Sequence, residues 1–218
     1  IQEKHADVEM VSEKGFTEEG QTFELASAMV LQNPDLKGIY VAWDVAAEGV
    51  IEALRAQGRS DVKVITHDLG QNNALDMIKQ GKGQVCFVSS LGGLMTTYGY
   101  SAYSASKYAV IGMAGALRQE LYRSGVGVSV LCPPEVDTPM VTNEAEHILP
   151  ETRFIKNIGG LLSPEHVAKA TVKGINKNKF IIIPGLVAKI SYANSRYFPT
   201  AFAWTMQKLV GLANRFVK

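Results

Sequence analysis

Tyr103 and Lys107 are the residues whose types and spacing indicate acid–base chemistry. They lie four positions apart in a segment with a helical pattern, so both side chains occupy one helix face. An ammonium group stabilises a neighbouring phenolate, which lets a tyrosine beside a lysine donate a proton and recover it. Ser90 follows an apolar strand pattern and could hold a substrate oxygen where that proton must arrive. The three residues therefore indicate carbonyl reduction or alcohol oxidation, with hydride from a nicotinamide cofactor.

The sequence around this pair is more specific than the pair itself. Taken alone, Tyr103 and Lys107 also fit a solvated pair on an amphipathic helix, because this spacing arises readily by chance. The surrounding stretches resemble the short-chain dehydrogenase/reductase family, over residues 88–90, 92–93, 103–107 and 133–140. This resemblance implies that Ser90 orients the substrate carbonyl, that Tyr103 is the acid/base and that Lys107 holds the nicotinamide ribose.

The same resemblance implies a cofactor site and a substrate class. The residues that would contact the cofactor are Tyr103, Lys107, Pro133, Val136 and Thr138. Within the family, the sequence is most similar to reductases that act on long-chain keto-lipids. The implied activity is NAD(P)-dependent reduction of a carbonyl group, or oxidation of the corresponding alcohol, on such a substrate.

Strand and helix patterns alternate along the chain. This alternation predicts an α/β fold of three layers with a doubly wound, mainly parallel sheet, Rossmann-like in class. The expected strands cover residues 8–11, 38–43, 62–66, 85–89, 127–132 and 180–183. The expected helices cover residues 17–33, 45–57, 72–80 and 102–123, a helix capped by Ser163, and the tail 185–218. Residues 133–162 are expected to be irregular.

Composition narrows the class of protein. A chain of 218 residues with 46% hydrophobic content can bury one good core, so we expect a single domain over residues 1–218. The net charge of +1 gives no reason to expect nucleic-acid binding. This total hides an asymmetry, since residues 1–83 carry a net charge of −6 and residues 84–218 a net charge of +7.

Cysteine and metal chemistry are not indicated. Cys86 and Cys132 both lie in apolar strand patterns, which predicts small buried side chains rather than a disulfide or a metal pair. Glu144, Glu146 and His147 lie close together in the expected loop, but they are too few for a metal site. We therefore expect no metal and interpret these three residues as solvated.

Membrane insertion is not indicated either. The apolar runs are shorter than the ~18 residues of a membrane span, so we expect no transmembrane segment and a soluble chain, cytoplasmic when produced recombinantly. The chain begins at Ile1 without a methionine, which suggests a truncated, processed or constructed polypeptide. The aromatic tail from Tyr192 to Leu212 is expected to pack on the sheet or to form a homodimer, with contact to a lipid surface as the alternative.

The expected cofactor site lacks its phosphate-binding part. A complete member of this family opens with a glycine-rich turn whose following helix takes the cofactor pyrophosphate. The turn at residues 12–20 has neither that glycine spacing nor a suitable charge, and its glutamates would repel a diphosphate. Gly-x-Gly-x-x-Gly occurs nowhere in the sequence. We therefore expect no bound cofactor, or NAD(P) if the chain is active.

The first part of the chain resembles a different family. Residues 1–83 resemble the periplasmic sugar-binding proteins of bacterial uptake systems, through residues 33–44, 49–54, 62–68 and 74–82. This resemblance implies that Asp44 and Asp68, which follow strand patterns, accept hydrogen bonds from sugar hydroxyls. The alternative, which we prefer, is that each aspartate caps the helix that follows it.

Together the two resemblances predict a chimera with a seam near Gly83 and Gln84, where the charge changes sign. Because both parents have parallel doubly wound sheets, their strands are expected to continue one another in a single hybrid domain. The first functional hypothesis is therefore an engineered or recombined fold without evolved activity, which retains Ser90, Tyr103 and Lys107 as a remnant. The alternative is the NAD(P)-dependent oxidoreductase, and the third is residual sugar binding.

Overall fold

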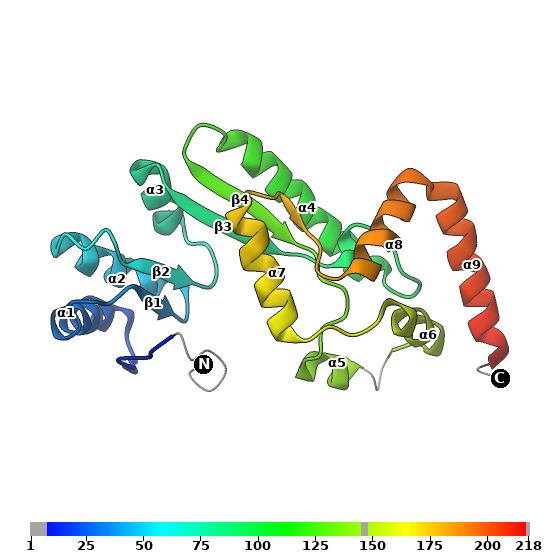
Figure 1. The fold of residues 1–218 in the computed structure, drawn as a ribbon, viewed down its shortest axis with the longest axis horizontal. Coiled ribbons are helices and arrows are strands. Elements are labelled where there is room, and N and C mark those ends of the chain that lie inside the picture. The colour runs from blue at the N-terminus through cyan, green and yellow to red at the C-terminus, as the bar shows by residue number, and fades with distance from the viewer. Residues whose placement is uncertain (1–7, 145–147, 217–218) are drawn as a thin grey trace. The chain divides into compact units, whose positions relative to one another are not determined.

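The structure of this protein is a computed structural model that describes residues 8–144 and 148–216. The chain divides into two compact units, residues 1–80 and residues 81–218 (Figure 1). The prediction of a single domain stays a prediction. Of the residues named above, Ile1, Glu146 and His147 lie outside the described residues.

The first unit contains a short parallel sheet with helices packed against it. Its elements are η1 (Glu19–Gln21), α1 (Thr22–Gln32), β1 (Gly38–Val41), α2 (Asp44–Ala56), β2 (Lys63–Thr66) and α3 (Gln71–Gln80). Strands β1 and β2 pair in parallel, with Gly38 opposite Lys63 and Val41 opposite Thr66. Helix α2 buries its small side chains Ala46, Ala47 and Ala53, which form a core with Val30 of α1 and Val41 of β1.

The second unit is a three-layer arrangement around a parallel sheet. Its strands are β3 (Gly83–Val88), β4 (Val126–Leu131) and β5 (Ile181–Ile182), in the order β3-β4-β5. Its helices are η2 (Leu91–Gly93), α4 (Ser101–Glu120), α5 (Pro139–Glu144), α6 (Pro150–Gly159), α7 (Pro164–Asn176), α8 (Leu186–Tyr197) and α9 (Pro199–Phe216). Helix α4 covers one face of the sheet, and helix α7 covers the other (Figure 1).

The sequence of β4 explains its central place. Five of its six residues are buried, because side chains on both faces meet a helix layer, as is typical of an inner parallel strand. Val128 and Val130 pack with Ala114 of α4, whereas Leu131 packs with Val167 of α7. Ser163 caps α7 as predicted, since its hydroxyl oxygen accepts a hydrogen bond from the His166 amide at 3.2 Å.

The α/β class and the parallel strands are confirmed, but two expectations about the fold are wrong. Among the described strands, β1 pairs with β2 in the first unit and β3, β4 and β5 pair in the second, and the continuation of one sheet across the predicted seam stays a prediction. Residues 8–11 form no strand, and the side chains of Val8, Met10 and Val11 are about half exposed. The segment 133–162 contains α5 and α6, each of which begins at a proline that is favourable in a first helical turn.

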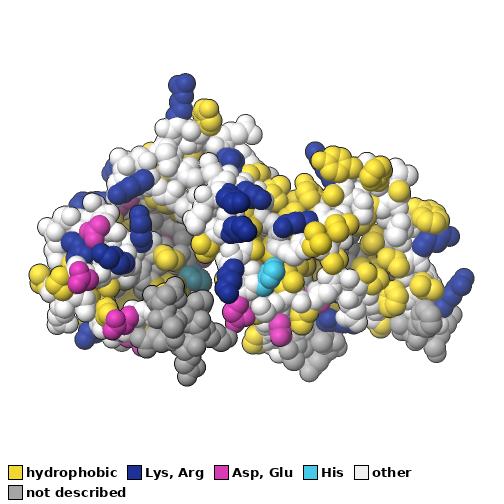
Figure 2. Space-filling view, viewed as in Figure 1, with side chains coloured by type: hydrophobic (Ala, Val, Ile, Leu, Met, Phe, Trp, Pro, Cys, Tyr) yellow, Lys and Arg dark blue, Asp and Glu magenta, His cyan; other side chains and the backbone are white. Residues whose placement is uncertain are grey.

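The tail of the second unit is helical, as expected, and leaves apolar side chains exposed. Helix α9 packs against α6 and α8. Hydrophobic side chains gather over the part of this unit that carries α8 and α9 (Figure 2). Tyr197 at the end of α8, Phe198 between the two helices and Trp204 of α9 are exposed. Within the described residues, none of the helices has the length and apolar character needed to span a membrane. Self-association through this tail stays a prediction.

Candidate active site

Ser90 lies where β3 ends and the chain turns into η2. Its hydroxyl oxygen accepts a hydrogen bond from the Gly92 amide at 3.1 Å, which caps the short helix and fixes the side chain. The backbone amide of Leu91, the residue after Ser90, donates a hydrogen bond to the carbonyl oxygen of Pro133 at 2.8 Å. The turn that carries Ser90 is thus attached directly to the segment that follows β4.

Tyr103 and Lys107 lie on the first two turns of α4, beside the Ser90 turn. A Cβ placed on Gly92 would lie 3.3 Å from Tyr103 Cε1 and 3.6 Å from Ser90 Oγ. The Tyr103 ring and the Ser90 hydroxyl therefore both lie next to the Gly92 Cα. Lys107 Nζ lies 5.6 Å from the centroid of the Tyr103 ring, a distance at which a cation interacts with an aromatic face. The Tyr103 side chain is 42% exposed and therefore open to a substrate. The structure brings the three predicted residues together, and their catalytic roles stay a prediction.

A close backbone contact holds α4 in this position. The buried Ser89 hydroxyl donates a hydrogen bond to the Lys107 carbonyl oxygen at 2.9 Å. Gly93 lies against the same carbonyl group, because a Cβ on Gly93 would lie only 2.7 Å from Lys107 O and 2.6 Å from Ser89 Oγ. The absence of a side chain at position 93 thus lets the helix approach the turn.

The predicted cofactor-binding residues of the third segment lie along the chain that leaves β4. Pro133 meets the Ser90 turn through the hydrogen bond to Leu91. Val136 forms an isolated parallel bridge with Leu162, and the Thr138 hydroxyl donates to the Val136 carbonyl oxygen at 3.2 Å. Pro133 is therefore beside the catalytic candidates, whereas the roles of Val136 and Thr138 in cofactor binding stay predictions.

The two aspartates predicted in the first unit do not cap their helices as expected. Helix α2 begins at Asp44 itself, with Trp43 at the N-cap and no side-chain capping bond. Asp68 has a positive φ of 61° and precedes α3, which begins only at Gln71. A left-handed residue this far ahead of the helix does not provide its cap. Asp44 follows β1, Asp68 follows β2, and Asp44 lies close to Gly70, two residues after Asp68. Both aspartates therefore lie at the edge of the sheet where β1 and β2 end.

Sequence reasoning missed a polar cluster next to Tyr103. The Tyr100 ring meets the Tyr103 ring edge-on, with centroids 5.3 Å apart and an interplanar angle of 80°. Lys156 of α6 lies 3.3 Å from the Tyr100 hydroxyl and 2.9 Å from the carboxylate of Glu135. Of Tyr100, Glu135 and Lys156, only Glu135 lies in a segment, residues 133–140, that carries the family resemblance. The pairing with α6 depends on tertiary structure.

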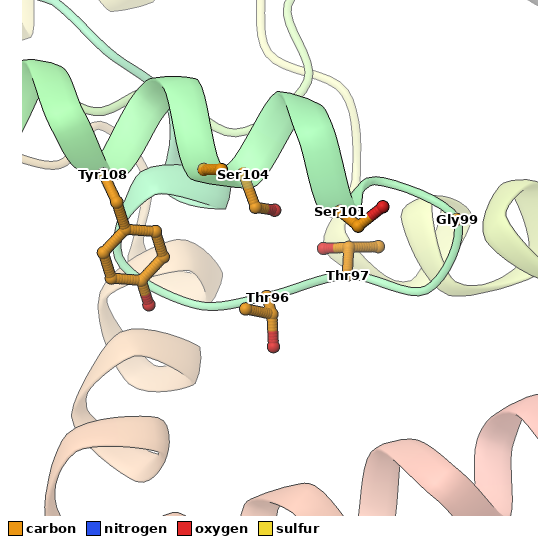
Figure 3. A pocket seen from close by; sticks show the side chains of 7 residues that line it. Thr96, Thr97, Gly99, Ser101, Ser104 and Tyr108 are labelled. Atoms are coloured by element: carbon orange, nitrogen blue, oxygen red, sulfur yellow. The ribbon is translucent and has the colours of Figure 1, made fainter.

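A cavity of about 440 Å³ lies beside the start of α4. The residues that line it are Thr96, Thr97, Gly99, Ser101, Ser104, Ala105 and Tyr108. Figure 3 shows Ser104 and Tyr108 on α4 and Thr96 on the loop opposite. Ser104 is only 3% exposed, and its hydroxyl has no hydrogen-bond partner among the described residues. The lining contains hydroxyl groups but no charged side chain, so the cavity carries no acid–base pair.

We expect Ser104→Ala to raise the free energy of unfolding, because a buried hydroxyl without a partner costs about 1–3 kcal/mol. Ser89→Ala is the matched control and should lower it by about 1 kcal/mol, since Ser89 donates to Lys107 O. Urea unfolding followed by circular dichroism measures both. A less stable Ser104→Ala variant would show that this hydroxyl gains a partner in solution.

Cys132 is buried, as predicted, whereas Cys86 is only partly buried. Burial raises the pKa of Cys132 to about 12 and also raises the pKa of Cys86. Both cysteines are free, and the described residues contain no cluster of His, Cys, Asp or Glu that could hold a metal ion. Neither thiol is suited to nucleophilic or redox chemistry.

We expect Cys132 to react slowly with iodoacetamide at pH 8, because the thiolate is the reactive form. A pKa of about 12 lowers the thiolate fraction on the order of a thousand-fold relative to an ordinary thiol. Alkylation followed by mass spectrometry, in native buffer and in urea, measures the difference. Equal rates in both solvents would contradict the burial of this side chain.

Comparison with protein families identifies the segment that holds the candidate site. Residues 69–149 match the family model described as short chain dehydrogenase. The match begins upstream of the predicted seam, so it includes residues 74–82, which also contribute to the sugar-binding resemblance. Nothing in the comparisons indicates a periplasmic binding-protein part.

Two of the similar proteins are named as reductases. A 3-dehydrosphinganine reductase from Danio rerio is 38% identical over 104 residues, and a 3-ketodihydrosphingosine reductase from Bos taurus is 40% identical over 104 residues. Each alignment covers 48% of this chain and 31% of the relative, so the aligned part spans about a third of these proteins. A Drosophila melanogaster protein named dehydrogenase/reductase SDR family protein 7-like is 29% identical over 177 residues, or 78% of this chain and 52% of that protein.

Among solved structures, the chain is similar to a short-chain dehydrogenase from Sphingobium yanoikuyae in complex with NADPH. That likeness has 14% identity and a TM-score of 0.46, and it covers 88% of this chain and 93% of the other. The sequence comparisons, rather than this likeness, establish the relationship. The segment that carries Ser90, Tyr103 and Lys107 is homologous to the short-chain dehydrogenases/reductases.

Proposed function

We propose that this chain carries the proton-transfer site of an NAD(P)-dependent oxidoreductase that acts on the carbonyl group of a long-chain keto-lipid. One observation supports the chemistry above all, namely that Ser90 and Tyr103 border the same point beside Gly92, with Lys107 next to the Tyr103 ring. The substrate class is supported by relatives named as reductases of 3-dehydrosphinganine and 3-ketodihydrosphingosine. The reverse reaction would oxidise the corresponding alcohol.

The three side chains have distinct roles in this proposal. Carbonyl reduction adds a hydride to carbon and a proton to oxygen, and a bound nicotinamide would supply the hydride. The Ser90 hydroxyl donates a hydrogen bond that orients the substrate oxygen. Tyr103 donates the proton to that oxygen, and the Lys107 ammonium stabilises the phenolate that remains.

The residues present fit one end of the cofactor. Lys107 and Tyr103 lie on neighbouring turns of α4, and their polar groups could hold a ribose hydroxyl next to the nicotinamide. The sequence contains no Gly-x-Gly-x-x-Gly turn for the pyrophosphate end. The proposal therefore assigns the cofactor only its contacts with Tyr103 and Lys107.

A second candidate function is a hybrid fold without evolved activity. The sequence feature from which this candidate arises is the change of net charge near Gly83, from −6 over residues 1–83 to +7 over residues 84–218. The homology of residues 69–149 supports the oxidoreductase, which we therefore place first.

Cofactor titration and turnover distinguish the two candidates. The purified chain would be titrated with NADH and with NADPH by fluorescence, and then assayed for cofactor oxidation with 3-ketosphinganine in detergent micelles. The oxidoreductase predicts saturable binding and oxidation that depends on the ketone, with cyclohexanone as the control for a carbonyl without a long chain. An absence of both binding and turnover would contradict the proposal and support the inactive hybrid.

A further inference from the structure

We propose that Lys156, anchored by Glu135, is a positioning residue that holds the Tyr100 ring against Tyr103. It would thereby fix the orientation of the proton donor. The inference rests on the proposed function for its catalytic consequence, whereas the contact itself can be tested without a cofactor. Neither Lys156 nor Glu135 belongs to the Ser90, Tyr103 and Lys107 set.

Glu135 is a buried carboxylate that binds two cations, Arg153 and Lys156. The Glu135 side chain is only 7% exposed, and its Oε1 lies 2.9 Å from Lys156 Nζ and 3.1 Å from Arg153 Nη1. A buried carboxylate requires such partners, because the loss of hydration is otherwise uncompensated. Glu135 therefore fixes the position of both cations on α6.

Lys156, which binds Glu135, also contacts Tyr100. Its ammonium group lies 3.3 Å from the Tyr100 hydroxyl and 5.3 Å from the centroid of the Tyr100 ring. The Tyr100 ring in turn meets the Tyr103 ring edge-on, which is the favourable geometry for two aromatic rings. A continuous series of contacts thus joins the buried carboxylate to the proton donor.

A second contact holds the same loop on the same helix. Thr152, one turn before Lys156 on α6, donates its hydroxyl to the Tyr98 carbonyl oxygen at 2.8 Å and is almost completely buried. The loop before Tyr103 is therefore attached to α6 at both Tyr98 and Tyr100. Because Thr152 holds the loop independently, removal of Lys156 should abolish its contacts with the Tyr100 hydroxyl and ring without releasing the loop.

Arg153 provides a matched control. It binds the same carboxylate through Nη1, whereas the hydrogen bond to the Tyr100 hydroxyl comes from Lys156. Lys156→Met and Arg153→Met each remove one of the two cations that bind Glu135. If Glu135 served only to dock α6, the two variants would affect the site in the same way.

The test follows the Tyr103 ring directly by NMR of protein with ¹³C-labelled tyrosine rings. The Tyr103 signal is assigned by its loss in Tyr103→Phe. Lys156→Met and Tyr100→Leu should displace this signal in the same direction, because Tyr100→Leu removes the edge-on ring and Lys156→Met removes the contact that holds it there, while Arg153→Met should leave the signal unchanged. An unmoved signal in Lys156→Met, or an equal displacement in Arg153→Met, would overturn the inference.

A more conservative variant keeps the test informative if Tyr100→Leu does not fold. Tyr100→Phe retains the ring and deletes only the hydroxyl that Lys156 binds, so it should displace the Tyr103 signal less than Tyr100→Leu does. In the turnover assay, Lys156→Met should lower kcat on the order of ten- to a hundred-fold with little change in KM, and Lys156→Arg should restore it. If the wild-type chain is inactive, the proposed function fails, whereas the NMR result still decides the positioning role.

Discussion

Tyr103→Phe is expected to lower ketone-dependent NADPH oxidation by about 10²–10⁴-fold, the range that a positioned acid or base contributes. The substitution removes one oxygen atom and retains the ring, which keeps its edge-on contact with Tyr100 and its place above Gly92. Cofactor binding should change little by comparison, because Lys107 remains. The measurement is the steady-state rate at saturating cofactor, together with a fluorescence titration of the cofactor.

Tyr108→Phe is the matched control for this prediction. Tyr108 lies on the same helix and is 45% exposed, close to the 42% of Tyr103, so the two substitutions are equally conservative. Burial raises the pKa of Tyr108, and its hydroxyl lies at the separate cavity rather than beside Ser90. We expect Tyr108→Phe to retain the wild-type rate. Equal losses in the two variants would contradict a specific role for the Tyr103 hydroxyl.

The candidate site could be predicted from sequence because its parts are nearly contiguous. A strand end places Ser90, and the first two turns of the following helix place Tyr103 and Lys107 on one face. Local rules of strand, turn and helix are sufficient to bring such residues together. The same rules could not find Lys156, which reaches Tyr100 only because α6 packs on a loop more than fifty residues earlier in the chain.

The arrangement of the sheets could not be predicted for a related physical reason. The strand patterns at residues 38–43 and 62–66 indicate where strands form, and β1 and β2 are found there. Pairing depends on which layers of side chains fit together, and the described strands pair as β1-β2 in the first unit and β3-β4-β5 in the second. The helix patterns within residues 133–162 were missed because short helices that begin at proline resemble loop sequence.

Gly93→Ala should destabilise the second unit and also disturb the site. The added methyl group would lie 2.7 Å from the Lys107 carbonyl oxygen and 2.8 Å from its carbonyl carbon, which are backbone atoms of α4. Backbone cannot rotate away as a side chain can, so the helix must move as a unit, at a cost of about 1–3 kcal/mol. Because Tyr103 and Lys107 move with the helix, turnover should fall along with stability.

Gly112→Ala on the same helix separates this contact from the general effect of replacing glycine. A Cβ on Gly112 meets no atom within 4 Å, and alanine favours a helix interior by about 0.5–1 kcal/mol relative to glycine. Urea unfolding should therefore show Gly112→Ala to be more stable than the wild type and Gly93→Ala to be less stable. A Gly93→Ala variant with wild-type stability and turnover would mean that α4 does not lie against the Ser90 turn at this distance. The site would then require a different account of how Tyr103 reaches Ser90.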